Sequence, residues 1–206
     1  MKRDKGIYKL FSQDTIIENF IEELGLNDTS VVSVVGAGGK TTLIENIADE
    51  FIAMGCKVII TTTTHILKPD SADDNRIYVG DSVICENTGK LKSPDEDTFL
   101  EMLLDNNCPI LIEADGAKGM PCKAPAEYEP VIRPETNVVI GVLSTRCIGG
   151  KIIDVCHRPE MVSRLLKKGK NDIITNKDLE EIFYNSNGLM KGVTQGMKYI
   201  PILRIG

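Results

Sequence analysis

Residues 31–42 read Val-Val-Ser-Val-Val-Gly-Ala-Gly-Gly-Lys-Thr-Thr, and this stretch decides the fold. The mostly β-branched run from Val31 to Val35 predicts a short buried strand that ends at a glycine loop. From Thr41 to Met54, apolar side chains recur on one face and predict a helix, with Gly55 as its C-terminal stop. A glycine-rich turn between a strand and a helix favours phosphate binding, because main-chain N–H groups and the positive helix end can face one phosphate.

The residues of this turn have expected roles in binding a nucleoside triphosphate. Lys40 is expected to reach the outer phosphates, and the Thr41 hydroxyl to ligate Mg²⁺. Val34 stands where the usual P-loop pattern has its first glycine, so the loop has a shorter form, similar to that of the Mur ligases. The alternative is a turn that binds nothing, which leaves the lysine and the paired threonines without a packing purpose. The residues expected to bind the nucleotide are Gly36, Ala37, Gly38, Gly39, Lys40, Thr41 and Thr42.

The alternation of strand and helix continues outward from this unit. Further strands are predicted at residues 57–63, 109–113, 138–143 and 199–203, and further helices at 14–24, around 99–104, at 160–168 and, capped by Thr175, at 177–184. This order predicts an α/β fold that is P-loop NTPase-like, a mainly parallel sheet with helices on both faces, with a small irregular hairpin between residues 77 and 91. A chain of 206 residues suits one such domain, residues 1–206.

The overall charge and hydropathy limit which classes of partner we expect. The chain has 24 Lys and Arg against 30 Asp and Glu, a net charge of −6. Nucleic acids and anionic membranes reward a basic face, so we expect neither as a partner. No apolar run is long enough to cross a bilayer, and the basic N-terminus is not followed by the apolar segment of a secretory signal. The sequence therefore predicts a cytoplasmic protein.

Two acids follow a buried strand and are candidates for the metal and for catalysis. A P-loop needs a second metal anchor, usually an acid at the end of a nearby strand, and Asp115 is expected to hold Mg²⁺. Glu113 is expected to be a second anchor or to orient an attacking water, with a turn cap as the alternative. Residues 61–65, Thr-Thr-Thr-Thr-His, end another strand, and parallel strand ends face one crevice. We therefore count His65, with Lys40, Glu113 and Asp115, among the catalytic candidates.

The segment 115–134 is a long loop with mixed charges, and long loops in a compact domain are often functional. Lys118 is expected to bind an anionic group near the crevice, and Lys123 is either a second such group or a solvated charge. Cys122 is a candidate reactive thiol only where neighbouring lysines lower its pKa. Further on, His157 and Arg158 either reach the same crevice or cap the helix that follows.

Several motifs together resemble one known family. They are Gly-Ala-Gly-Gly-Lys-Thr-Thr (36–42), Thr-Thr-Thr-Thr-His (61–65), Glu-Ala-Asp-Gly-Ala-Lys-Gly (113–119), Lys-Ala-Pro-Ala-Glu-Tyr-Glu-Pro (123–130) and His-Arg-Pro-Glu (157–160). In this order they closely resemble the YqeC-type selenium-dependent hydroxylase accessory proteins, from about residue 14 to the C-terminus. The resemblance implies a P-loop protein that binds ATP or GTP with Mg²⁺ and assists maturation of a selenium-dependent molybdenum hydroxylase. The implied partners are that hydroxylase or its cofactor-assembly proteins.

The chain departs from the family pattern after its last predicted strand. The family continues there with a base-reading turn and a further helix, whereas this chain stops at Gly206. Base preference, and whether the domain is truncated, are therefore left open.

Three functions remain to be distinguished. The favoured one is an NTPase or an NTP-using transferase. A second is a nucleotide-responsive binding module or chaperone with little hydrolysis. The third, a small ATP-dependent ligase, is weakened because the chain has no room for extra substrate domains.

Overall fold

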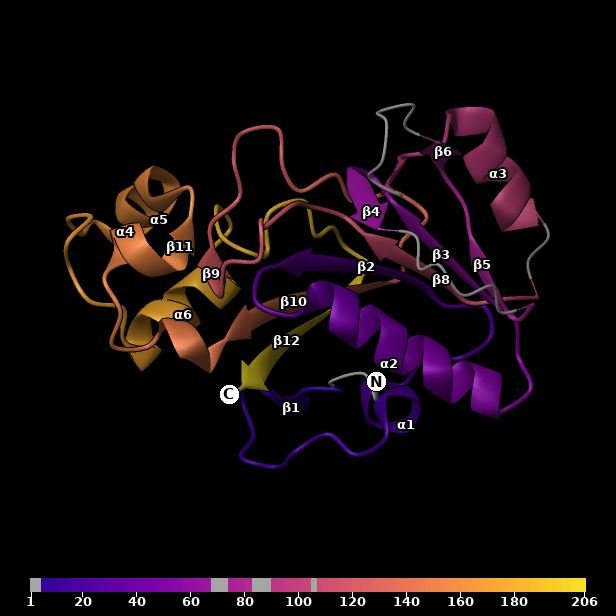
Figure 1. Ribbon diagram of the computed structural model, residues 1–206, viewed down its shortest axis with the longest axis horizontal. Helices are drawn as coiled ribbons and strands as arrows, with labels where there is room; N and C mark the ends of the chain where they lie inside the picture. The colour runs from indigo at the N-terminus through magenta and orange to yellow at the C-terminus, as the bar shows by residue number, and fades with distance from the viewer. Residues whose placement is uncertain (1–4, 68–73, 83–89, 105–106) are drawn as a thin grey trace.

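The computed structural model describes residues 5–67, 74–82, 90–104 and 107–206, and its centre is a seven-stranded sheet (Figure 1). In spatial order its strands are β1 (Ile7–Leu10), β12 (Lys198–Ile205), β10 (Val138–Ser144), β2 (Val31–Gly36), β8 (Ile110–Glu113), β3 (Val58–Thr62) and β5 (Arg76–Tyr78). All neighbours run parallel except β1, which is antiparallel to β12. The predicted α/β fold with a mainly parallel sheet is confirmed, and the parallel strands end at one edge.

Helices cover both faces of the sheet. Side chains alternate across a strand, so Val32 and Val34 of β2 pack with α1 (Phe20–Leu24) and α2 (Lys40–Ala53) in one core. The next side chain on the other face, Val35, packs in a second core with α5 (Pro159–Leu166) and α6 (Asn176–Tyr184). A third, smaller core joins α3 (Glu96–Leu104) to β3 and β8. In Figure 1, α4 (Ile152–Val155), α5 and α6 gather at the end opposite α3.

The helix predicted over residues 14–24 forms only in its second half. Asn19 begins α1, because its side chain accepts a hydrogen bond from the N–H of Glu22 at 3.0 Å. Asp14, predicted to be the cap, pairs instead with Lys9 at 2.8 Å on a segment that runs beside β1. The predicted stop is confirmed, since Gly25 ends the helix with a left-handed φ of 65°.

The other predicted helices agree with the structure more closely. Thr175 begins α6 in a capping box, in which its N–H donates to the Asp178 carboxylate at 2.7 Å. Gly55 follows α2 with a φ of 84°, as a stop residue should. Helices α3 and α5 begin and end within a few residues of their predicted bounds.

The hairpin predicted between residues 77 and 91 is only partly correct. Strands β6 (Asp81–Ser82) and β7 (Lys90–Lys92) pair antiparallel, and β4 (His65–Leu67) pairs with the other side of β7. The turn itself, residues 83–89, lies outside the described residues. Ile77 belongs to β5, which extends the large sheet beside β3. In the described part of the chain no helix has the length and apolar character that crossing a membrane requires.

Candidate functional site

The glycine loop, residues 36–42, lies at the carboxyl edge of the sheet, between the end of β2 and the start of α2. The loop can follow its tight path because Gly38 and Gly39 carry no side chain. Gly38 has a φ of 75°, and a Cβ there would lie 2.6 Å from the Cβ of Ser144 and 2.8 Å from the carbonyl oxygen of Pro121. Gly39 has a φ of 138°, which side-chain-bearing residues rarely adopt. The loop can therefore pack closely against two other segments only because it carries glycine.

The main-chain N–H groups of the loop divide into two sets. The N–H of Ala37 donates to the Val142 carbonyl at 2.8 Å, and that of Gly36 donates to both oxygens of Asp115 at 3.1 and 3.0 Å. Within the described residues, the N–H groups of residues 38–42 donate to no protein acceptor. They surround the N-terminus of a 14-residue helix that has no side-chain cap and no acid in its first turn. This is the environment that attracts an anion.

A cavity of about 380 Å³ opens directly in front of these N–H groups. The cavity is lined by Gly38, Gly39, Lys40, Thr41, Thr42, Glu113, Ala117, Lys118, Gly119, Pro121, Ser144, Arg146 and Arg204. Among the described residues, its lining includes Lys118, Arg146, Arg204 and Lys40, whose ammonium points behind the loop, and one acid, Glu113. In a chain of net charge −6, this lining concentrates positive charge at one place.

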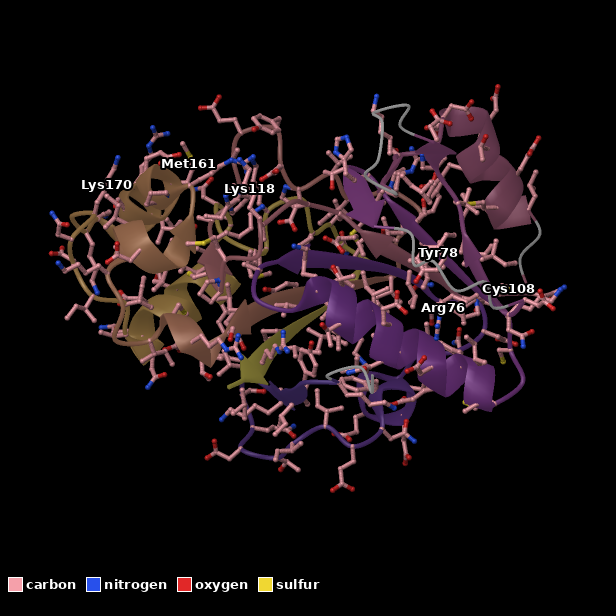
Figure 2. All side chains as sticks on the ribbon, in the orientation of Figure 1. Arg76, Tyr78, Cys108, Lys118, Met161 and Lys170 are labelled. Atoms are coloured by element: carbon pink, nitrogen blue, oxygen red, sulfur yellow. The ribbon has the colours of Figure 1, made fainter. Side chains whose placement is uncertain are left out.

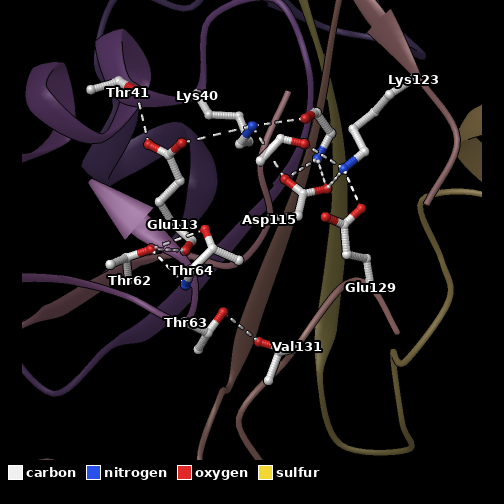
Figure 3. Close-up of polar contacts among 12 residues, drawn as sticks. Lys40, Thr41, Thr62, Thr63, Thr64, Glu113, Asp115, Lys123, Glu129 and Val131 are labelled. Carbon is white, nitrogen blue, oxygen red and sulfur yellow. Dashed lines mark hydrogen bonds and ion pairs between the residues drawn. The ribbon is translucent and has the colours of Figure 1, made fainter. Parts of the chain in front are cut away.

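Lys40 and Asp115 belong to a buried network behind the loop (Figure 3). The Lys40 ammonium donates to the Gly36 carbonyl at 2.8 Å and lies 3.2 Å from Asp115 Oδ1. The other oxygen of Asp115 is 2.9 Å from the ammonium of Lys123, which also donates to Glu129 at 2.9 Å. Asp115 and Lys123 are both fully buried. Asp115 thus has its oxygens engaged by one N–H group and two ammonium groups.

Glu113, rather than Asp115, faces the cavity. Its Oε2 accepts a hydrogen bond of 2.8 Å from the Thr41 hydroxyl, and its Oε1 lies 3.9 Å from the Lys40 ammonium. Burial raises the pKa of the Glu113 carboxyl above its ordinary value of 4.5, against the opposing effects of Lys40 and of the Thr41 hydrogen bond. Asp115 was expected to hold Mg²⁺ and Glu113 to be a second anchor or to orient a water; of the two acids, Glu113 is the one that lies beside the Thr41 hydroxyl.

The threonine run at the end of β3 does not line the cavity. Its hydroxyls donate instead to main-chain carbonyls: Thr61 to Val79 at 2.9 Å, Thr62 to Glu113 at 2.8 Å and Thr63 to Val131 at 3.0 Å. Thr62 thereby fixes the backbone that carries the Glu113 carboxyl. The neighbouring residue of the motif, His65, is exposed on β4 and is not among the residues that line the cavity.

The residues of the loop 115–134 that were predicted to lie near the crevice occupy different environments. Lys118 is exposed, lines the cavity and has a left-handed φ of 49°. Lys123 is buried in the network and not in the cavity. The Cys122 thiol is fully buried, and hydrogen bonds with Cys147 and Cys156 together with that burial raise its pKa, which is the reverse of what a reactive thiol requires.

His157 and Arg158 lie further from the glycine loop, at the start of α5, and neither lines the cavity. The Arg158 guanidinium pairs with Glu129 and donates to the Tyr128 hydroxyl at 2.9 Å, which extends the buried network to the surface. Burial and the positive charge of Arg158 lower the pKa of His157.

Two arginines of the cavity, Arg146 and Arg204, were missed by the sequence analysis. Arg146 follows β10, and its N–H is held by the Ser144 side chain at 3.3 Å. Arg204 lies near the end of β12, and its Cδ lies 2.7 Å from where a Cβ on Gly39 would be. Both stand at the carboxyl ends of parallel strands. The rule that singled out residues 61–65 would have found them had it been applied to every strand.

Comparison with known proteins agrees with these motifs. The family model described as "YqeC protein" matches residues 32–160, which include the glycine loop, both acids and His157. A protein of Escherichia coli strain K12 described as "Uncharacterized protein YqeC" is 32% identical over an alignment of 189 residues, and the aligned part covers 83% of this chain and 74% of that protein. No solved structure is found to match the chain. The chain belongs to the YqeC family.

Proposed function

We propose that this chain is a P-loop NTPase-like protein that binds a nucleoside triphosphate, ATP or GTP, with Mg²⁺ in the cavity at the start of α2. The observation that carries the proposal is the set of unbonded N–H groups of residues 38–42 in the described structure. A triphosphate tail satisfies them, and the positive end of the helix favours its charge. Lys118, Arg146 and Arg204 stand around the same cavity and complement the outer phosphates.

Lys40 must exchange partners to reach a phosphate. It now contacts the Gly36 carbonyl and Asp115 behind the loop. If its ammonium turns into the cavity, Asp115 keeps the Gly36 N–H and the Lys123 ammonium at 2.9 Å. The buried carboxylate is then still paired, so the exchange does not leave an isolated buried charge. In this proposal Asp115 holds the loop in shape and does not bind the metal.

The residues present fit a magnesium ion through Thr41 and Glu113. Mg²⁺ prefers oxygen ligands and usually takes few from the protein, with phosphates and water supplying the rest. The Thr41 hydroxyl and the Glu113 carboxylate lie 2.8 Å apart at the cavity wall, and both can offer oxygens on the side where the phosphates sit. A bound Mg²⁺ supplies charge neutralisation of the phosphates. Positive charge at this place also favours the ionised Glu113, whose pKa burial raises.

The biological role that we propose follows from family membership and its implied function. The protein acts as an accessory factor in the maturation of a selenium-dependent molybdenum hydroxylase, with that enzyme or its cofactor-assembly proteins as partners. Hydrolysis is the favoured reaction. A nucleotide-responsive binding module with little hydrolysis is a second candidate, because the glycine loop is joined to the surface at Arg158 and Tyr128 through the buried network.

Phosphate release from purified protein with Mg-ATP and with Mg-GTP tests the proposal. We expect release that requires Mg²⁺ and that Lys40→Ala abolishes, with Lys170→Ala as a matched variant of an exposed lysine outside the cavity. Binding without release, with or without a molybdenum hydroxylase, would identify the nucleotide-responsive module. Release that persists in Lys40→Ala would show that the activity comes from another site or from a contaminant.

A further inference from the structure

A second hollow of about 470 Å³ lies outside the nucleotide cavity. It is lined by Ala124, Pro125, Ala126, Glu127, Met161, Arg164, Leu165, Lys167, Asn185, Asn187 and Lys191. Three segments that are distant in sequence form it: the loop that follows Lys123, helix α5 with its C-terminal residue, and the segment after α6. Figure 2 labels Met161 on α5, at the end of the molecule opposite Arg76 and Tyr78.

The lining divides into an apolar floor and a cationic rim. Ala124 and Ala126 are buried, and Met161 and Leu165 pack partly buried against the core beneath them. The rim carries Arg164, Lys167 and Lys191 against one carboxylate, that of Glu127. Among the residues that the structure describes, none of the three cations forms an ion pair. An apolar floor with an uncompensated cationic rim is complementary to an anionic group on an apolar body.

Lys191 is fixed in the wall of this hollow. Its ammonium donates to the carbonyls of Ala126 at 2.6 Å and Glu127 at 2.8 Å. An ammonium has three N–H donors, so one remains for a ligand. The same two bonds hold the loop to the segment after α6. The hollow is therefore a built feature with at least one cation already oriented.

The loop 115–134, which lines one side of this hollow, also lines the nucleotide cavity. Its residues 117–121 include the lining of the first cavity, and residues 124–127 line the second. Between them, Lys123 pairs with Asp115, which accepts from the N–H of Gly36. A ligand in the second hollow would thus contact the stretch of chain that supports the glycine loop.

We propose that this hollow is a second ligand site, which takes a small organic anion: a carboxylate, phosphate or sulfonate group on an apolar body. The anionic group meets Lys191 and Arg164, and the apolar body rests on Ala124, Met161 and Leu165. The site is separate from the nucleotide cavity and does not depend on the function proposed for that cavity.

Titration with the fluorescent probe 8-anilinonaphthalene-1-sulfonate tests the site. We expect saturable binding of one probe per chain, and displacement by benzoate or phenyl phosphate but not by neutral benzamide. Arg164→Glu and, independently, Lys167→Glu should weaken binding about tenfold, because each places a negative charge on the rim. Lys170→Glu is the matched control, since Lys170 is exposed at the same end of the molecule but outside the hollow (Figure 2).

Four results would overturn the proposal. The first is no saturable binding at about millimolar probe. The second is equal weakening by Lys170→Glu, and the third is displacement by benzamide as strong as by benzoate. Because Arg164 and Lys167 are both exposed, at least one variant should keep the thermal unfolding of the wild type. The fourth is full displacement by excess Mg-ATP, which would place the probe in the nucleotide cavity, whereas we expect the probe to stay bound. A protein that binds the probe but no nucleotide would refute only the function proposed for the first cavity.

Discussion

Two carboxylates two residues apart should respond in opposite ways to removal of their charge. Asp115 is fully buried, accepts the Gly36 N–H, and lies 3.2 Å from the Lys40 ammonium and 2.9 Å from that of Lys123. Asp115→Asn removes the negative charge between two buried cations. Removing one partner from a buried ion pair costs about 3–5 kcal/mol. For a chain of this size that corresponds to a fall in Tm of roughly 6–20 °C.

Glu113→Gln should behave differently. Burial raises the pKa of Glu113, so the charged form is disfavoured by folding, and a neutral amide of the same shape should change the free energy of unfolding by less than about 1 kcal/mol. The variant should instead lose most of the gain in nucleotide affinity that Mg²⁺ provides, because the amide is a weaker ligand for the ion.

Urea unfolding of both variants, with calorimetric titration of nucleotide in Mg²⁺ and in chelator, measures the two effects separately. We expect Asp115→Asn to lose stability and, where folded, to bind nucleotide more tightly with Mg²⁺ than without it, as the wild type does. We expect Glu113→Gln to keep its stability and to lose most of the effect of Mg²⁺ on nucleotide affinity. If Glu113→Gln unfolds as easily as Asp115→Asn, or if Asp115→Asn keeps wild-type stability and loses the effect of Mg²⁺, the assignment of roles is wrong.

Three further predictions follow from the same contacts. Gly39→Ala should cost about 1–3 kcal/mol of stability, because its φ is 138° and the new Cβ would lie 2.7 Å from Arg204; urea unfolding with no loss would contradict this packing. Arg146→Ala should weaken Mg-ATP binding about tenfold by calorimetry, or roughly 1.4 kcal/mol, with Tm unchanged and Lys170→Ala as control; equal affinities would remove Arg146 from the site. Because the pKa of Glu113 is raised, its charge is lost at a higher pH than that of an ordinary carboxyl, so Mg²⁺-dependent binding should weaken as pH falls even above 4.5, and Glu113→Gln should flatten that profile. The same pKa shift affects stability: as pH rises, the Glu113 carboxyl ionises first in the unfolded chain, and this lowers the free energy of unfolding of the wild type. The free energy of unfolding of Glu113→Gln, relative to that of the wild type, should therefore rise with pH until the folded carboxyl ionises as well.

Local sequence patterns were sufficient to predict the strand and the helix at the centre of the fold. The β-branched run before Gly36 and the helical periodicity after Lys40 fix β2 and α2, because both depend on neighbours in the chain. The helix predicted from Asp14 failed because apolar spacing persists there while Asn19 supplies the real cap. Capping depends on one side chain, which a periodic pattern does not reveal.

The site was predicted less completely because its charges come from distant positions. Glu113 and Asp115 stand together in the sequence, and nothing there tells which of them turns under the glycine loop. The answer depends on Lys123, which folds back and pairs with Asp115. Arg146 and Arg204 each follow or end a predicted strand, so the strand-end rule marks both as candidates, but only the strand order β12-β10-β2 shows that they line the same cavity as the glycine loop. Such tertiary neighbours are not encoded by local spacing.

Isothermal titration of Mg-ATP and Mg-GTP into the wild-type chain tests the central claim most directly. The N–H groups of residues 38–42 have no acceptor in the part of the chain that the structure describes, so we expect one bound nucleotide per chain, an affinity that falls when Mg²⁺ is removed, and loss of binding in Lys40→Ala. No heat with any nucleoside triphosphate at about millimolar concentration, or binding that is unchanged in Lys40→Ala, would contradict the account.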